Sequence, residues 1–234
     1  LLKKFADDSK AKAGEFYTPR SVVQLLIRIL DPQPGESVYD PACGSGGMLI
    51  EAVHHMNHSS LCCGNIFGQE KNVVNSAIAK MNLFLHGASD FNIMQGDTLR
   101  NPKILQGGEV AKFDCVIANP PFSLEKWGSV EWSSDKYGRN IWGTPSDSCG
   151  DYAWIQHMIA SMAPGKGRMA VVMPQGVLFR GNEEGRIREK LVKSDMVEAV
   201  VTLGDKLFYG TGLSPCFLII RKMKPAAHSA RILM

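Results

Sequence analysis

Short runs of β-branched and aromatic residues alternate in this chain with longer segments that carry a helical period. The runs predict seven strands, at residues 37–40, 65–70, 92–96, 113–118, 168–173, 198–203 and 216–221. Helices are predicted at residues 20–30, 46–57, 73–86, 151–163 and 183–193. Because parallel strands are joined by crossovers that usually contain a helix, this alternation predicts an α/β fold with a mostly parallel sheet and helices on both faces.

The last two predicted strands break this rhythm. The glycine-punctuated loop that joins them, residues 204–214, is too short for a usual helical crossover. The last strand is therefore expected to run antiparallel to its neighbours. A chain of 234 residues without a convincing linker is expected to form one domain, residues 1–234.

Composition excludes a membrane-spanning protein and little else. No apolar run approaches the roughly 20 residues that a membrane span needs, and the first residues lack a secretory signal, so we expect a cytoplasmic protein. The net charge of +3 permits a nucleic-acid partner without arguing for one. His54, His55 and His58 lack the glutamate of an H-E-x-x-H motif, so a plain helix surface is favoured and no metal is expected.

A glycine-rich turn follows the first predicted strand, in the stretch "VYDPACGSGGML", residues 38–49. Glycines permit positive φ and close backbone approach, and the N-terminus of the next helix offers free N–H groups. The candidate ligand-binding residues are Asp40, Ala42, Gly44, Ser45, Gly46 and Gly47. Leu49 departs from G-x-G-x-x-G, and NAD, flavin and S-adenosylmethionine proteins all use such a turn. The choice among these cofactors, or a purely structural turn, stays open at this point.

Two further predicted strands end in acids. Glu70, in "GQEKN", is placed to accept both hydrogen bonds of a ribose diol, or to serve as a helix-start carboxylate. Asp97, in "GDTL" with Thr98 beside it, is placed to accept from the exocyclic amine of an adenine. The carboxyl ends of parallel strands meet at one edge of a sheet, so Asp40, Glu70 and Asp97 outline a ligand crevice there.

The segment before the first helix, "GEFYTPR", is expected to border this crevice. The hydroxyls of Tyr17 and Thr18 are placed to reach a ligand's amino-acid end, with Pro19 restricting their approach. An apolar lead into the helix is the alternative.

The fourth predicted strand ends in "VIANPPFS", residues 116–123. Pro120 and Pro121 have a fixed φ and no N–H donor, and Pro120 keeps Asn119 out of the helical region. The groups left exposed are acceptors, because the Asn119 side-chain oxygen and the Pro120 carbonyl can both accept from one NH2 group. A Pro-Pro turn that ends a strand by chance is the alternative.

Two acceptors on one NH2 group suit methylation of the exocyclic amine of adenine. The lone pair of this amine is delocalised into the ring, and two acceptors turn it outward. These contacts strengthen as the nitrogen becomes positive during attack on an activated methyl group, so they stabilise the transition state more than the ground state. Phe122 would stack on the base, which must be flipped out of the duplex to reach this edge.

The motifs in this order resemble the modification subunits of type I restriction-modification systems, which are N6-adenine DNA methyltransferases. "EFYTPR", "DPACGSGGML", "GQEKN", "GDTL", "NPPF" and "FYGTGLSPC" carry the resemblance over nearly the whole chain. It implies a Rossmann-like seven-stranded methyltransferase fold, S-adenosylmethionine as cofactor and double-stranded DNA with a flipped adenine as substrate. It also implies a specificity subunit, a second modification subunit and a restriction subunit as partners. We expect this chain to be a fragment without the family's N-terminal helical domain and C-terminal docking segment.

The resemblance also assigns residues, motif by motif. The cofactor's methionine end would be surrounded by Glu15, Phe16, Tyr17, Thr18, Pro19, Arg20, Ser45, Gly46 and Gly47. Glu70 would bind its ribose and Asp97 its adenine, while Asn119, Pro120, Pro121 and Phe122 would hold the target adenine. The late aromatic motif matches Phe208 and Tyr209, one of which would pack on the flipped base or else in the core.

Residues 123–150 have little periodicity and form a long connection for a compact domain. Aromatic and basic side chains interleave there: Lys126, Trp127, Trp132, Lys136, Tyr137, Arg139 and Trp142. Two interpretations stay open, a surface loop held down by its own aromatics or a lid that stacks on bases and touches phosphates. Arg180, Arg186 and Arg188 are further candidates for phosphate contacts.

Three other functions remain open. The side-chain amide of a protein glutamine presents the same geometry as the adenine amine, although enzymes of that kind generally have Tyr where this chain has Phe122, and they lack "EFYTPR". A methyltransferase of structured RNA is the second. A cofactor-binding scaffold without activity is the third, and the intact motif at residues 119–122 argues against it.

Overall fold

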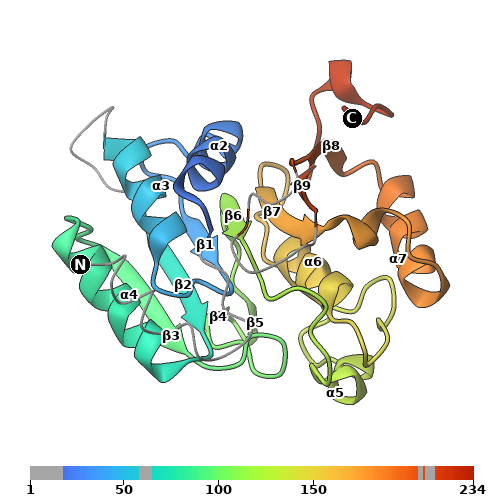
Figure 1. Ribbon diagram of the computed structural model, residues 1–234, viewed down its shortest axis with the longest axis horizontal. Coiled ribbons are helices and arrows are strands. Elements are labelled where there is room, and N and C mark those ends of the chain that lie inside the picture. The colour runs from blue at the N-terminus through green and yellow to red at the C-terminus, as the bar shows by residue number, and fades with distance from the viewer. Residues whose placement is uncertain (1–17, 58–64, 205–207, 209–213) are drawn as a thin grey trace.

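A seven-stranded sheet forms the centre of the computed structural model, which describes residues 18–57, 65–204, 208 and 214–234 (Figure 1). The strands are β1 (Val38–Asp40), β2 (Ile66–Glu70), β3 (Phe91–Gln95), β6 (Cys115–Ala118), β7 (Arg168–Pro174), β8 (Val197–Thr202) and β9 (Pro215–Arg221). Their order across the sheet is β3-β2-β1-β6-β7-β9-β8. The seven predicted strands are confirmed, and each lies within about two residues of its predicted bounds.

Strand direction also follows the prediction. β1 pairs in parallel with β2 and β6, and the β2–β3 and β6–β7 pairs are parallel as well. β9 runs antiparallel to both β7 and β8. The sheet is therefore Rossmann-like, mostly parallel with an antiparallel last strand. The chain order reverses between β1 and β6, and open α/β sheets bind their ligands at such a switch point.

Helices cover both faces of this sheet. α2 (Arg20–Leu30), α3 (Gly47–Asn57) and α4 (Val73–Leu85) lie on one face, and α6 (Asp151–Ala160) and α7 (Asn182–Lys193) lie on the other. The strands show why, because successive side chains alternate between faces. In β6, Cys115 and Ile117 join the core beneath α2 and α3, whereas Val116 and Ala118 join the core beneath α6 and α7. This explains why all four residues of β6 are buried.

Local sequence explains where individual helices begin and end. α2 follows Pro19 and ends at Asp31, which adopts the left-handed conformation with φ of 47°. Its buried positions have the spacing of one helix face: Val22, Val23, Leu26, Ile27 and Leu30. α4 begins after Asn72, whose side chain accepts from the N–H groups of Val74 and Asn75.

Several short elements were not predicted. They are the hairpin β4 (Leu105–Gln106) and β5 (Glu109–Val110), the helix α5 (Ser129–Ser133), and the 3-10 turns η1 (Gln175–Leu178) and η2 (Ala226–His228). None of the helices in the described part of the chain has the length and apolarity that crossing a membrane requires.

The long connection at residues 123–150 folds inward. Trp127 and Trp132 are only 2% and 1% exposed, and their rings meet edge to face with centroids 5.5 Å apart. The guanidinium of Arg139 lies 4.5 Å from the centre of the Trp132 ring and forms a buried ion pair with Asp135. The structure thus favours a loop held down by its own aromatic side chains over a base-stacking lid for these residues.

Candidate active site at the carboxyl edge of the sheet

A pocket of about 330 Å³ lies beside the carboxyl end of β1, where the strand order reverses. Its volume is at the lower end of the range for ligand pockets. Segments far apart in the sequence form its wall, and they bring together these predicted residues: Thr18, Arg20, Asp40, Ala42, Gly44, Ser45, Gly47 and Asn119. Part of the predicted cofactor set and the first residue of N-P-P-F therefore share one pocket, whereas Gly46, Glu70, Asp97 and Thr98 do not line it.

The glycine turn between β1 and α3 leaves open space for a ligand. Gly44 and Gly46 have φ angles of 54° and 85°, in the left-handed region that glycine adopts without strain. A Cβ atom added to Gly44 or Gly47 would meet no protein atom within 4 Å. Gly47 also begins α3, so the unpaired N–H groups of that helix start at the pocket wall.

Asp40 is a buried carboxyl group in the wall of this pocket. It is 2% exposed, and its Oδ1 accepts from the backbone N–H of Ala42 at 2.9 Å. Burial raises the pKa of Asp40 to about 8; the Ala42 hydrogen bond opposes the rise and the nearby charge of Glu70 adds to it. The carboxyl group therefore keeps its proton near neutral pH until a cation comes close.

Glu70, at the end of β2, supports the glycine turn from the side. Its Oε2 accepts from the N–H of Gly44 at 2.9 Å, and its Oε1 accepts from the N–H of Asn72 at 2.7 Å. It thus has the helix-start role that the sequence left open. Contact of Glu70 with the ribose of a cofactor stays a prediction.

Asp97 and Thr98 lie on the loop after β3. The Oδ2 of Asp97 is 3.0 Å from the Lys71 ammonium, and its Oδ1 accepts from the N–H of Arg100. Thr98 is buried, and its hydroxyl donates to the Pro41 carbonyl at 2.6 Å. Thr98 thereby ties this loop to the turn after β1, while contact of either residue with a cofactor stays a prediction.

Asn119 stands at the end of β6 with a defined orientation. Its Nδ2 donates to the Thr18 hydroxyl at 2.8 Å. In the described part of the chain, no hydrogen bond uses its Oδ1, which is left to accept from a ligand. Phe122 is half-buried, and its ring centroid lies 6.4 Å from that of Phe208, which is 2% exposed and belongs to the core.

Some predicted residues cannot be placed in this geometry. Glu15, Phe16, Tyr17 and Tyr209 lie outside the described residues. Pro19 precedes α2, Pro120 is buried, and Pro121 is half-buried.

Three pocket residues with polar side chains that can ionise were not predicted as part of a ligand site: Glu51, His54 and His86; the apolar side chains of Val23, Met48 and Ile50 and the thiol of Cys43 complete the wall. Gly47, Glu51 and His54 are spaced by four and three residues on α3, so they lie on one helix face, and this spacing is a signal that sequence reasoning missed. His86 comes from the end of α4, with its ring 5.3 Å from that of His54. No local pattern in the sequence connects His86 with this pocket.

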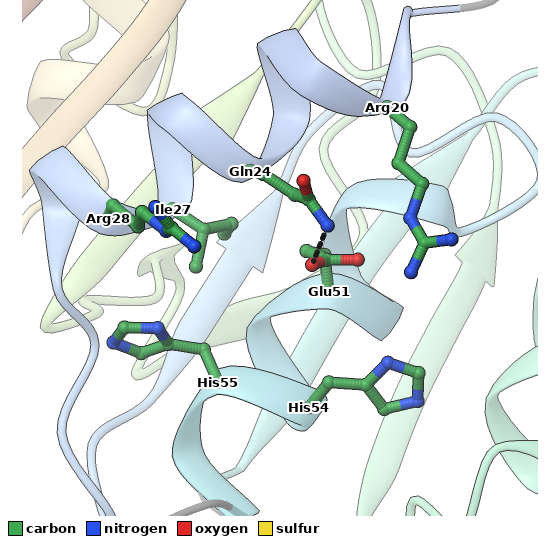
Figure 2. A pocket seen from close by; sticks show the side chains of 7 residues that line it. All are labelled: Arg20, Gln24, Ile27, Arg28, Glu51, His54 and His55. Atoms are coloured by element: carbon green, nitrogen blue, oxygen red, sulfur yellow. Dashed lines mark hydrogen bonds between the residues drawn. The ribbon is translucent and has the colours of Figure 1, made fainter.

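A larger pocket, of about 470 Å³, lies between α2 and α3 (Figure 2). It shares Arg20, Glu51 and His54 with the first pocket. In Figure 2, Gln24 of α2 reaches across to Glu51 of α3, and its Nε2 donates to Oε1 at 3.1 Å. Neither the glycine turn nor Asp40 nor Asn119 lines this larger pocket, so we assign the candidate active site to the smaller one.

A cluster of possible metal ligands lies next to Ser123, the residue that follows the N-P-P-F motif. One ligand atom each from Cys149, Asp151 and Glu184 falls within 4.8 Å of the others. The guanidinium of Arg180 forms ion pairs with both carboxylates. Arg180 therefore holds the position that a cation would take.

The candidate phosphate-binding arginines have different surroundings. Arg180 is engaged in the two ion pairs just described, and Arg188 donates to the carbonyls of Val177 and Arg180. Arg186 pairs with Glu183 on the surface, with its side chain 73% exposed. Of these three arginines, Arg186 is the one whose position suits a phosphate contact.

Comparison with known proteins gives consistent relatives. Residues 1–234 match the family described as N-6 DNA Methylase. The chain is 36% identical to the type I restriction enzyme MjaVII methylase subunit of Methanocaldococcus jannaschii, over 100% of this chain and 40% of that protein. It is 32% identical to the type I restriction enzyme HindI methylase subunit of Haemophilus influenzae, over 96% of this chain and 50% of that protein.

A solved structure supports the same relationship. The type I restriction-modification system methyltransferase subunit from Streptococcus thermophilus superimposes with a TM-score of 0.85 at 30% identity. The match covers 95% of this chain and 48% of that one. The chain thus spans half the length of these relatives or less.

Proposed function

Because this chain belongs to the N-6 DNA methylase family, we propose that it is the catalytic domain of a type I modification subunit, which methylates the exocyclic amine of adenine in DNA. The observation that carries the proposal is the position of Asn119 in the same pocket as Asp40 and the glycine turn. An acceptor for the target amine and a cradle for a methyl donor then stand at one edge of the sheet. Methyl transfer needs such an arrangement, because the two reactants must meet in line.

The residues of the pocket fit S-adenosylmethionine. Open space above Gly44 and Gly47 admits a ligand to the backbone, and the buried carboxyl group of Asp40 suits a cationic ligand. When bound, this cofactor supplies an activated methyl group. We assign binding of its ribose to Glu70 and binding of its adenine to Asp97, with Thr98 as the next residue on the same loop. Its methionine end belongs to Thr18, Arg20, Ser45, Gly46 and Gly47, together with residues 15–17 and Pro19 ahead of α2 and with Ala42 after β1.

The target adenine would be held by the N-P-P-F motif. The Oδ1 of Asn119 and the carbonyl of Pro120 accept from the two hydrogens of the target amine, while Thr18 keeps the amide of Asn119 in the orientation this requires. Both contacts strengthen as positive charge develops on the nitrogen. No general base is needed before methyl transfer, since the proton leaves afterwards.

We also propose that the target base is flipped out of the duplex. An amine inside a duplex cannot reach Asn119, and flipping costs a few kcal/mol of unstacking. Phe122 offsets part of this cost by stacking on the flipped base, with Phe208 packed behind it. Pro121 has no N–H and stiffens the turn that presents the ring.

The complete protein would act in a complex. The relatives are named as subunits of type I restriction enzymes, so we propose a specificity subunit, a second modification subunit and a restriction subunit as partners on double-stranded DNA. Residues 1–234 would be one catalytic domain, with the family's N-terminal helical domain and C-terminal docking segment outside it. The inward packing of Trp127, Trp132 and Arg139 argues against a role of these side chains in reading bases, and we propose that the specificity subunit reads the target sequence.

The experiment that tests the proposal separates chemistry from cofactor binding. In the complete modification complex, Asn119→Ala should abolish methyl transfer to DNA and leave the calorimetric affinity for S-adenosylmethionine within about threefold of wild type, because Oδ1 faces the target. Asn92→Ala, at an exposed position of β3, is the matched control and should transfer methyl groups normally. Undiminished methylation by the Asn119→Ala complex would contradict the assignment.

A further inference from the structure

The chain is anchored directly after the N-P-P-F motif by a buried acid from another element. The backbone N–H of Ser123 donates to Oδ1 of Asp151 at 2.7 Å. Asp151 is the first residue of α6 and is 0% exposed. One residue further on, the Leu124 carbonyl accepts from the N–H of Gly150 at 2.9 Å. The exit of the motif is thus joined to the N-terminus of α6 by two hydrogen bonds.

The N-P-P-F turn needs anchors from outside itself. Pro120 and Pro121 have no N–H groups, so they cannot donate to hydrogen bonds that would close the turn. Ser123 has a φ of 49°, a left-handed conformation that costs energy for a residue with a Cβ atom. A strong acceptor at a fixed position keeps Ser123 in this conformation, and the Asp151 carboxylate is such an acceptor.

The Asp151 carboxylate is itself fixed from two sides. Its Oδ2 pairs with the Arg180 guanidinium, and the Nε of Arg180 donates to Glu184 at 2.5 Å. Being at the start of α6, the carboxylate also benefits from the positive end of that helix. A Cβ atom on Gly176 would come within 2.5 Å of Nη1 of Arg180, so the absence of a side chain there leaves room for the guanidinium. The carboxylate is therefore held in one orientation in a buried site.

We propose that Asp151, oriented by Arg180, is a positioning residue for methyl transfer. By fixing Ser123, it fixes the Pro120 carbonyl and the Phe122 ring relative to the transferred methyl group. Asp151 itself does not touch the substrate or the cofactor. This inference rests on the function proposed above.

The test uses the complete modification complex with three variants. Asp151→Ala removes both the acceptor and one of the two ionic partners of Arg180, whereas Asp151→Asn keeps an oxygen that can accept from Ser123. Glu36→Ala is the matched control, because Glu36 pairs with the largely buried Arg168 at the opposite edge of the sheet, ahead of β1. For each complex, thermal stability, cofactor affinity and the single-turnover rate of methyl transfer to DNA are measured.

The proposal predicts a selective loss of rate. Asp151→Ala should lower the single-turnover rate on the order of 10- to 100-fold, the effect expected from misplacing a reacting group by about 1 Å. Cofactor affinity should stay within about threefold of wild type, and Asp151→Asn should recover part of the rate. Glu36→Ala should lose stability without a comparable loss of rate.

Two results would overturn the proposal. One is a folded Asp151→Ala complex with a rate within about twofold of wild type, and the other is an equal loss of rate in Glu36→Ala. If Asp151→Ala does not fold, Asp151→Asn decides, because it should still be slower than wild type when Arg180 has lost one of the two carboxylates with which it pairs. A wild-type complex that methylates no DNA would instead refute the proposed function, and with it the role of Asp151.

Discussion

The side-chain amide of Asn119 donates to the hydroxyl of Thr18 at 2.8 Å, and this bond joins the segment ahead of α2 to the end of β6. An asparagine side chain has a donor end and an acceptor end, so a partner for the donor decides where the acceptor points. Thr18 therefore does for Asn119 what Asp151 does for Ser123. Each holds one end of the N-P-P-F motif in place.

Thr18→Val should slow methyl transfer without preventing it. The substitution keeps the shape of the side chain and removes the acceptor, and one hydrogen bond of about 1 to 1.5 kcal/mol corresponds to roughly tenfold in rate. Thr18→Ser keeps the hydroxyl and should transfer methyl groups at nearly the wild-type rate. The measurement is the single-turnover rate at saturating cofactor. Equal rates in the Val variant and wild type would show that Asn119 does not depend on Thr18.

Asp40 should release a proton when the cofactor binds. Its pKa is raised to about 8 by burial, so the carboxyl group is mostly protonated at pH 7 in the free protein. A cationic ligand favours the carboxylate, so affinity should rise as the pH approaches 8, with close to one proton released per cofactor at pH 7. Calorimetry in buffers of different ionisation enthalpy measures this release, which Asp40→Asn should abolish. A binding enthalpy that is the same in every buffer would contradict the prediction.

The raised pKa of Asp40 also makes the stability of the free protein depend on pH. The folded pKa lies above the ordinary value of 3.8, so the folded protein binds the proton of Asp40 more tightly than the unfolded chain does. The resulting contribution to stability is fully present below the ordinary carboxyl pKa and is lost as the pH rises through about 8. Bound cofactor should reverse part of this loss, because it favours the carboxylate.

Arg139→Ala should destabilise the protein strongly. The guanidinium donates to the carbonyls of Thr98 and Leu99, and its ion pair with Asp135 is buried, with side chains 2% and 4% exposed. Removing one partner of a buried pair leaves an uncompensated charge, at a cost of about 3 to 5 kcal/mol in the free energy of unfolding.

Chemical denaturation measures the effect of Arg139→Ala, and Arg186→Ala is its control. Arg186 pairs with Glu183 on the surface, where an ion pair contributes about 0 to 1 kcal/mol. If both variants lost the same stability, the Arg139 network would not be the anchor of residues 123–150.

The sequence predicted the sheet well because several of its strands are buried, mostly apolar runs, such as β6 at residues 115–118 and β7 at residues 168–174. It missed the hairpin β4–β5, whose strands have two residues each, because such short elements have no measurable period. The buried network around Arg139 could not be predicted from the sequence either. Arg139 donates to Nδ1 of His157, and Nε2 of His157 is 3.1 Å from the hydroxyl of Tyr39. These three residues come from separate segments, and no local pattern relates them.

For the candidate site, too, the sequence predicted the positions of some residues but not their hydrogen-bond partners. Asp40 and Asn119 were predicted to lie close together because both follow strands at one edge of the sheet, and one pocket contains both. Thr98 was predicted beside the cofactor, and this stays a prediction; the bond of its hydroxyl to the Pro41 carbonyl was not foreseen. Arg180 was a candidate for phosphate contact, but its guanidinium is paired with Asp151 and Glu184. A polar side chain's partner depends on tertiary packing, which the sequence around it does not encode.

Mass spectrometry of nucleosides measures the central claim most directly. DNA is incubated with the complete modification complex and S-adenosylmethionine labelled in its methyl group, and the nucleosides, the protein and added RNA are then analysed separately. We expect the label in N6-methyladenine from DNA, and its absence when the complex carries Asn119→Ala. Label on glutamine side chains or on RNA, with unlabelled DNA, would contradict adenine methylation by this pocket.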